Sequence, residues 1–355
     1  MKVLSIVGAR PQFIKVKPVI ESFRRNRIQH ILLHTGQHYD YEMSKIFFQQ
    51  LNIPKPDYHL NVKGQTSTQQ TALILQGLEG ILKKERPDMV LVYGDTTSTM
   101  AGALASVHQK IPLGHVEAGL RSYRLDMPEE VNRVLTDHMS NLLFCPTKAA
   151  VDNLKREGIT KNVFFVGDVM YDVFKQNISV GHSNILKKNG VKPKGYYLLT
   201  IHRQDNADNI ENLKSILLAL GKIKDSVVFP VHPRTQKMLK TLKDFKPENL
   251  PNILFISPVG YLDMLILEKN AKKILTDSGG VQKEAYFLNV PCITLRNETE
   301  WKETLNDGCN TLAGVSQEKI LKAIKKTAPR KKPKSFFGDG RAAEEMVEVL
   351  KKILG

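Results

Sequence analysis

The sequence predicts an α/β protein made of two doubly wound, Rossmann-like domains. Two observations lead to this fold class. The 355 residues exceed one ordinary hydrophobic core and suit two domains of roughly 150 to 180 residues. Short β-branched runs also alternate with helical patterns in both halves, which is typical of βαβ units around a parallel sheet.

In the first half, strands are expected at residues 2–7, 31–33, 89–93, 113–116, 142–144 and 163–166. Helices are expected between them, near 13–25, 67–85, 97–108 and 130–139. The pattern restarts in the second half with strands at 196–201, 227–231, 253–256, 273–276 and 292–295. We therefore expect domains at 1–168 and 169–338. Residues 339–355 carry apolar side chains at helical spacing and are expected to pack back onto the first domain.

Composition and charge limit the function classes. The chain is 41% hydrophobic and 25% charged, with no apolar run of the roughly 20 residues that a membrane helix needs. We expect a cytoplasmic protein with no membrane partner and three free thiols, because Cys145, Cys292 and Cys309 form no CxxC pair. The net charge of +16 suits a solvated basic face or an anionic substrate, and charge alone does not choose between them. No nucleic-acid partner is expected, because the lysines are scattered.

Polar residues follow seven of the predicted strands. Ligands of open parallel sheets bind beyond the carboxyl ends of the strands, so these segments are the candidate site. They are Gly8-Ala9-Arg10-Pro11 with Lys15 beyond, Thr35-Gly36-Gln37-His38, Gly94-Asp95-Thr96, His115-Val116-Glu117-Ala118-Gly119, His202-Arg203, His232-Pro233-Arg234 and Asp277-Ser278-Gly279-Gly280.

The last of these segments predicts a phosphate site. Its glycines let the backbone approach a ligand, and the free N–H groups of the helix that follows attract an anion. Glu284 lies deeper along that helix, where it can accept hydrogen bonds from ribose hydroxyls. Neither GxGxxG nor GxxxxGK[ST] follows a strand, which argues against NAD and against a P-loop enzyme.

Simpler interpretations stay open for several residues. Asp95 and Ser278 stand where helices begin, so each is a candidate cap as well as a candidate ligand-binding residue. Glu129 and Glu130 suit the first turn of a helix, and Arg133 is placed to pair with Glu129. His232 is also compatible with a histidine of the core.

The ordered set of segments, together with Pro128-Glu129-Glu130-Val131-Asn132-Arg133, resembles the non-hydrolysing UDP-N-acetylglucosamine 2-epimerases. The resemblance covers nearly the whole chain. It implies a glycosyltransferase-B-like fold with a central cleft between the domains, a homodimer, no redox cofactor and no metal. It also implies interconversion of UDP-GlcNAc and UDP-ManNAc through elimination of UDP to a 2-acetamidoglucal and its re-addition.

The resemblance also implies the roles of individual residues. Asp95, Glu117, Glu129 and His202 match the family's catalytic carboxylates and histidine, without an assignment to either face of the sugar ring. The residues expected to bind the substrate are Arg10, Lys15, Gln37, His38, Arg133, His232, Met264, Ser278, Gly279, Gly280 and Glu284.

One departure from the family pattern bears on the choice of sugar. Many bacterial members have Thr-Glu-Arg-Pro-Glu after the last strand, whereas this chain has Trp301 in the place of the arginine. A sister branch acts on UDP-2,3-diacetamido-2,3-dideoxy-glucuronate and is the alternative substrate class. A glycosyltransferase shares the fold and the UDP site, but the ordered carboxylates Asp95, Glu117 and Glu129 favour the epimerase.

Overall fold

The protein is described by a computed structural model that covers residues 1–37, 45–62, 66–178, 183–242, 249–306, 308–326 and 334–355. The chain divides into two compact units, Met1–Gln176 with Ser335–Gly355 and Asn177–Lys334. The first unit therefore runs beyond the expected break at 168, and the chain returns to it at Ser335.

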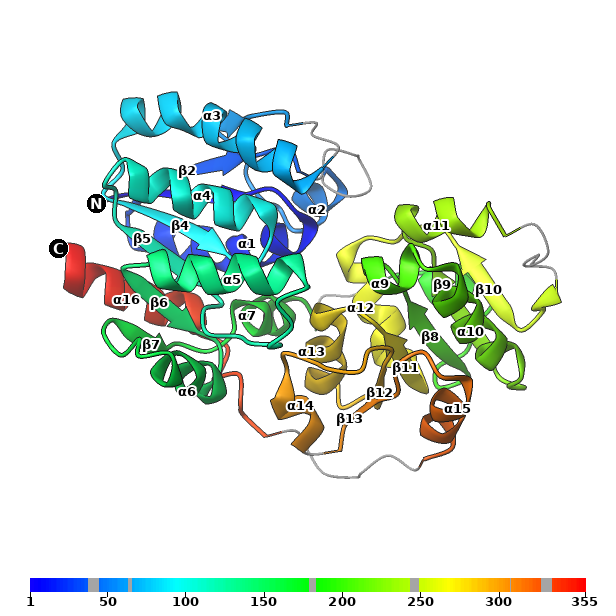
Figure 1. Cartoon of the computed structure of the whole chain (residues 1–355). Coiled ribbons are helices and arrows are strands. Elements are labelled where there is room, and N and C mark those ends of the chain that lie inside the picture. Colours follow the sequence, from blue (N-terminus) through cyan, green and yellow to red (C-terminus); the bar gives the residue numbers. More distant parts are fainter. Residues whose placement is uncertain (38–44, 63–65, 179–182, 243–248, 307, 327–333) are drawn as a thin grey trace. The chain divides into compact units, whose positions relative to one another are not determined.

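The first unit holds a fully parallel seven-stranded sheet, here sheet A, in the order β3-β2-β1-β4-β5-β6-β7 (Figure 1). The order reverses between β1 and β4, which is the switch point where doubly wound sheets bind ligands. Its strands are β1 (Lys2–Val7), β2 (Gln29–His34), β3 (Tyr58–His59), β4 (Met89–Tyr93), β5 (Leu113–Val116), β6 (Leu142–Cys145) and β7 (Val163–Phe165).

Helices cover both faces of sheet A, as a parallel sheet requires. They are α1 (Arg10–Arg25), α2 (Lys45–Gln50), α3 (Ser67–Glu85), α4 (Thr97–His108), α5 (Pro128–Met139), α6 (Lys148–Arg156), α7 (Val169–Asn177) and α16 (Ala342–Leu354). Alternate residues of β1, β2 and β4 pack with Ile74, Leu78 and Leu82 of α3 and with the alanines of α4 in one buried cluster. The predicted doubly wound fold is confirmed.

The second unit repeats the topology in a fully parallel six-stranded sheet B, in the order β10-β9-β8-β11-β12-β13. Its strands are β8 (Tyr196–Thr200), β9 (Ser226–Pro230), β10 (Ile253–Ile256), β11 (Lys273–Thr276), β12 (Cys292–Thr294) and β13 (Asn310–Leu312). Its helices are α8 (Ile185–Lys188), α9 (Gln204–Ala207), α10 (Ile210–Gly221), α11 (Pro233–Leu239), α12 (Tyr261–Asn270), α13 (Gly279–Phe287), α14 (Lys302–Asn306) and α15 (Gln317–Lys325). The switch point lies between β8 and β11.

The C-terminal helix α16 packs against α1 within the first unit (Figure 1). Arg25 pairs with Glu344 at 3.0 Å, and the Lys351 ammonium donates to the Asn26 side chain at 2.7 Å. The start of α16 is held by the buried Asp172 of α7, whose two carboxylate oxygens accept the N–H groups of Ala342 and Ala343 at 3.0 and 2.8 Å. Asp172 therefore supplies a remote cap to the last helix.

No helix in the described part of the chain is long and apolar enough to cross a membrane. Cys145, Cys292 and Cys309 are buried and are not joined by disulfides. Burial raises the pKa of the Cys292 thiol to about 12, so this side chain behaves as a small core residue.

Asp172 gives the fold a testable dependence on pH. Burial raises the pKa of Asp172 to about 6, although the N–H groups of Ala343 and Ala342 oppose that shift. Between pH 4 and 6 the unfolded chain then loses this proton before the folded protein does, so raising the pH lowers the free energy of unfolding. Asn resembles the protonated form. We expect the stability of the wild type relative to Asp172→Asn to fall by on the order of 1–3 kcal/mol from pH 4 to 7, measured by urea unfolding. A constant difference across this range would contradict the prediction.

Candidate active site

The beginning of α1 is tied to the end of β4 by one buried glutamine. The Gln12 carbonyl accepts the N–H groups of Gly8 and Ala9 at 2.7 and 2.9 Å. Its amide group donates to the Tyr93 carbonyl at 2.9 Å and to the Thr99 hydroxyl at 3.0 Å. This bonding explains why α1 starts at Arg10 rather than near Phe13, and it joins strands β1 and β4 at the switch point.

Lys15 and Glu117 form a buried ion pair at this edge of sheet A. The Lys15 ammonium lies 2.5 Å from Glu117 Oε1, and the two side chains are 6% and 7% exposed. Glu117 follows β5 with a φ of 73°, in the left-handed region. Gly94, at φ +65°, makes room for the pair, since a Cβ there would stand 2.8 Å from the Lys15 ammonium and 3.4 Å from Glu117 Oε1. The geometry brings together two residues that sequence analysis placed at different strand ends.

Asp95 follows β4 and is held by two residues of α5. Its carboxylate pairs with the Arg133 guanidinium, and its backbone carbonyl accepts from the Asn132 amide at 3.0 Å. The capping interpretation of Asp95 is wrong, because α4 is capped by Thr96, whose hydroxyl accepts the Thr99 N–H. The Asp95 carboxylate is thus left for a role other than capping.

Behind these residues lies a polar network that sequence analysis did not identify. Both ring nitrogens of the buried His115 face acceptors, Asp137 Oδ1 and the Gly94 carbonyl, each at 2.7 Å. The Arg121 guanidinium donates one hydrogen bond to Asp137 at 2.6 Å and two to the Glu157 carboxylate, each at 2.6 Å. Burial raises the pKa of Asp137, but His115 and Arg121 outweigh it and lower that pKa overall. The sequence held one signal for this network: Asp137 lies one helical turn after Arg133, so both side chains project from the same face of α5.

The remaining first-unit predictions fall at or near the same edge. Arg10 opens α1, and Glu129 stands in the first turn of α5. The Gln37 carbonyl accepts the Ser98 hydroxyl at 2.7 Å and the Ser98 N–H at 3.2 Å, which ties the segment after β2 to the start of α4. His38 lies outside the described residues.

In the second unit, the buried Asp277 organises the ends of β8 and β11. Its carboxylate accepts the backbone N–H groups of His202 and Arg203 at 3.1 Å, and the His202 ring lies 3.2 Å from it. Burial raises the pKa of Asp277, but His202 and the backbone donors outweigh it and keep that pKa below its usual value. Asp277 therefore fixes the orientation of the partly exposed His202.

Ser278 caps α13 through its hydroxyl, which accepts the Val281 N–H at 3.5 Å, so the capping interpretation is confirmed for this residue. Gly279 and Gly280 form the first turn. A Cβ on Gly279 would stand 2.5 Å from Glu300 Oε1 and 2.9 Å from the Trp301 indole nitrogen. Only glycine lets this buried carboxylate lie so close to the beginning of the helix.

The same carboxylate holds two arginines. Glu300 pairs with Arg203 at 3.3 Å and with Arg296 at 2.9 Å. Trp301 is buried beside it, with the Lys283 ammonium 4.0 Å from the ring centroid, a cation–π contact. The position where many bacterial members have arginine is thus an indole packed on α13.

The other second-unit predictions are placed less uniformly. His232 caps α11, its ring 5.6 Å from that of His202, so it lies at the strand edge rather than in the core. Glu284 is buried in the second turn of α13. Met264 belongs to a buried hydrophobic cluster with Leu267, Val281 and Ala285. Within the described residues it therefore packs as a core residue.

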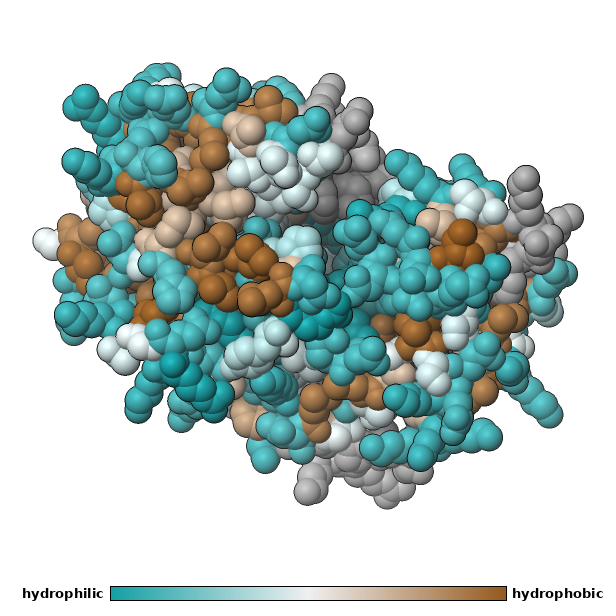
Figure 2. Space-filling model, in the orientation of Figure 1, coloured by the Kyte–Doolittle hydropathy of each residue, from teal (hydrophilic) through white to brown (hydrophobic). Residues whose placement is uncertain are grey.

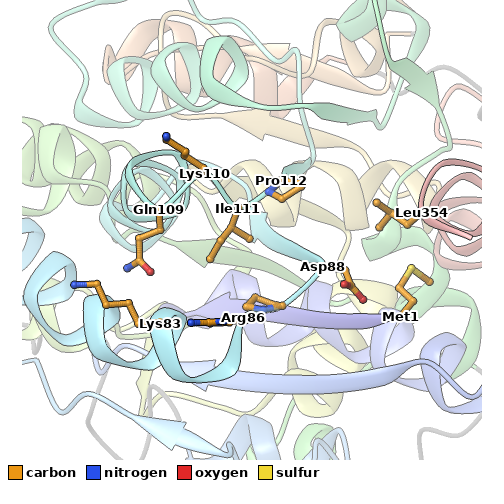
Figure 3. Close-up of a pocket in the computed structure, with 10 residues that line it drawn as sticks. Met1, Lys83, Arg86, Asp88, Gln109, Lys110, Ile111, Pro112 and Leu354 are labelled. Carbon is orange, nitrogen blue, oxygen red and sulfur yellow. The ribbon is translucent and has the colours of Figure 1, made fainter.

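A cavity of about 740 Å³ lies at the opposite, amino edge of sheet A (Figure 3). Lys83, Arg86 and Lys110 stand around it, with Asp88 between them and Met1. These cations lie at the C-terminal ends of α3 and α4, where they complement the negative end of the helix dipole. We therefore assign no chemistry to this cavity. The described residues also contain no cluster of three or more His, Cys, Asp or Glu side chains suited to a metal.

Known proteins resemble this chain over its whole length. The family described as UDP-N-acetylglucosamine 2-epimerase matches residues 21–351. A UDP-N-acetylglucosamine 2-epimerase homolog of Methanococcus maripaludis is 53% identical, over 99% of this chain and 100% of its own. The UDP-2,3-diacetamido-2,3-dideoxy-D-glucuronate 2-epimerase of Pseudomonas aeruginosa is 43% identical, with 99% and 100% covered.

Among solved structures, the UDP-GlcNAc 2-epimerase of Methanocaldococcus jannaschii in complex with UDP-GlcNAc and UDP superposes with a TM-score of 0.92. It is 45% identical, and the match covers 99% of this chain and 100% of that one. The chain therefore belongs to the UDP-N-acetylglucosamine 2-epimerase family.

Proposed function

We propose that this protein is an isomerase that interconverts UDP-N-acetylglucosamine and UDP-N-acetylmannosamine. Family membership along the whole chain supports the reaction class. The observation that carries the proposal is the edge of sheet A, where the buried Glu117 meets Lys15 and the partly exposed Asp95 meets Arg133. Such an edge supplies the carboxylates that proton transfer at carbon requires.

The chemistry explains the need for these groups. Carbon 2 of the sugar is not adjacent to a carbonyl, so its proton is not acidic enough for simple removal. In the proposed route a base takes the C2 proton, the C2–H electron pair forms a C1–C2 double bond, and the C1–O pair leaves with UDP. In the return step an acid gives a proton to C2 on the opposite face, the C1–C2 π pair forms the new C2–H bond, and a UDP oxygen supplies the electron pair of the new C1–O bond. Atoms and electrons balance without a redox cofactor.

We assign the acid–base work to Asp95, Glu117 and Glu129, with His202 as a further catalytic group. Arg10 and Lys15 supply positive charge against the departing diphosphate. Binding of UDP is assigned to the second unit, where the N–H groups and dipole at the beginning of α13 suit a phosphate and Glu284 suits the ribose. His38, Gln37, Arg133, His232 and Met264 stay predictions for substrate contact.

Proton NMR in D₂O tests the reaction directly. With UDP-GlcNAc as the sole addition, we expect UDP-ManNAc that carries deuterium at C2. Asp95→Asn and Glu117→Gln should each lower the rate by roughly 10²-fold or more, because each removes an acid–base group. Glu344→Gln, which breaks the exposed pair with Arg25, is the control and should match the wild type.

A second substrate is favoured by two observations and enters the same experiment. The 43% identical relative is a UDP-2,3-diacetamido-2,3-dideoxy-D-glucuronate 2-epimerase. In addition, Trp301, which contacts Lys283 of α13, stands in the place of the arginine that many bacterial members have after the last strand. If the protein converts that sugar but not UDP-GlcNAc, the diacetamido-glucuronate is its substrate. Conversion of neither sugar would reject the proposed function.

The glycine at the beginning of α13 tests where UDP binds. Gly279→Ala forces apart Glu300 and Trp301 or displaces the first turn, so we expect the Kd for UDP to rise at least about tenfold, or about 1.4 kcal/mol, in calorimetry. The control is Gly80→Ala on the exposed face of α3, where an added Cβ meets nothing within 4 Å. Unchanged UDP affinity in Gly279→Ala would place the nucleotide elsewhere.

We also propose that the protein is a homodimer and works in the cytoplasm. Three cysteines that form no disulfide suit a reducing compartment. Exposed apolar side chains on the adjacent helices α3, α4 and α5 support self-association, and Figure 2 shows hydrophobic residues gathered over this part of the first unit. They are Leu73, Val107, Val131 and Leu135.

Analytical ultracentrifugation tests the dimer. The wild type should sediment at twice the 40.1 kDa of the chain, and Leu135→Glu should shift it to the monomer, because a charge in an apolar interface is costly. Leu218→Glu, at an exposed leucine of α10 in the second unit, is the matched control and should remain dimeric. A monomeric wild type would contradict the proposal.

A further inference from the structure

Glu130 joins the 121–127 loop to the next turn of its own helix through its two carboxylate oxygens. It is 1% exposed and stands in the first turn of α5. Oε1 accepts the Tyr123 N–H at 2.7 Å. Oε2 accepts the Ser122 N–H and hydroxyl, each at 2.9 Å, and pairs with Arg133 Nη1 at 2.7 Å. Its contacts therefore reach both the 121–127 loop and the next turn of its own helix.

Arg133 carries this restraint to the edge of sheet A. The guanidinium is 2% exposed, with Nη1 against Glu130 and Nη2 against the Asp95 carboxylate. A guanidinium is planar and rigid, so fixing one of its nitrogens fixes the direction in which the other points. Asn132 holds the Asp95 backbone from the same helix. The orientation of the Asp95 carboxylate thus depends on where Glu130 holds Arg133.

The loop is part of the same arrangement. Tyr123 has a φ of 62°, in the left-handed region that costs a tyrosine of the order of 1 kcal/mol or more. The N–H of this strained residue is the donor to Glu130 Oε1, so the carboxylate offsets the strain directly. A loop that moves at Tyr123 therefore also changes the environment of the carboxylate that anchors Arg133.

We propose that Glu130 is a positioning residue: it holds Arg133 against Asp95 and couples the conformation of the 121–127 loop to that carboxylate. The assignment rests on the proposed function, in which Asp95 takes part in proton transfer at C2. Glu130 itself contacts Ser122, Tyr123 and Arg133. It acts on the reaction through Arg133.

Glu130→Gln tests the proposal, because it keeps the size of the side chain and removes its charge. We expect kcat to fall about 10- to 100-fold, with KM and the Kd for UDP within about threefold of the wild type. Asp126→Asn is the matched control, since Asp126 lies in the same loop but pairs only with the exposed Arg124 among its described ion pairs. That variant should behave as the wild type.

A double-mutant cycle separates positioning from general damage. Arg133→Lys keeps the charge but loses the planar fork whose two nitrogens face Glu130 and Asp95 separately, so alone it should also lower kcat. If both residues act through one contact, the double variant should lose clearly less than the product of the two single losses. Multiplicative losses, or a fall in UDP affinity and unfolding temperature in step with kcat, would overturn the proposal.

A crystal structure of Glu130→Gln gives a readout that does not depend on the substrate. The distance between the Arg133 guanidinium and the Asp95 carboxylate should lengthen beyond 4 Å; an unchanged ion pair would overturn the positioning role, whichever sugar the enzyme converts. If Glu130→Gln does not fold, the structure and kcat of Arg133→Lys test the same contacts, because Arg133 lies between Glu130 and Asp95. If the wild type converts neither sugar but the variant separates Arg133 from Asp95, the proposed function alone is rejected.

Discussion

The cost of burying carboxylates at the ends of parallel strands governs the structure of both units. A carboxylate removed from water is strongly destabilising unless a cation or several N–H groups face it. The buried Glu117 has Lys15, the buried Asp277 has His202 together with backbone donors, and the partly exposed Asp95 has the buried Arg133. These partners come from different elements in each case. The requirement for compensation therefore fixes helices and strand-end segments against one another at the switch points.

The two units share a strand order but use this constraint differently. In the first, side-chain cations from α1 and α5 reach carboxylates beyond β4 and β5. In the second, the N–H groups after β8 converge on Asp277, and Glu300 gathers two arginines beside the beginning of α13. One topology thus holds its strand-end carboxylates in two ways. Side-chain cations face them in the first unit, and backbone donors and paired arginines face them in the second.

The strand pattern was sufficient to predict the fold and the edge of each sheet that carries the polar residues. Periodicity and the rule for strand ends placed Asp95, Glu117 and His202 just beyond strands, and they follow β4, β5 and β8 in the structure. It did not predict β3 or β13, because strands of two or three residues leave no periodic signal. Nor did it predict that Arg133 pairs with Glu130 and Asp95, because side-chain pairing depends on the crossing of α5 over the sheet.

Two glycines, Gly94 and Gly279, allow contacts between charged side chains that the strand pattern could not predict. The Lys15–Glu117 pair exists at its observed distance because Gly94 has no Cβ, and Glu300 reaches the start of α13 because Gly279 has none. In the sequence these glycines resemble ordinary turn residues. Their function is spatial, since each removes an obstacle from the path of a charged side chain that comes from another element. The position of the buried charges is therefore set as much by the glycines as by the charged residues themselves.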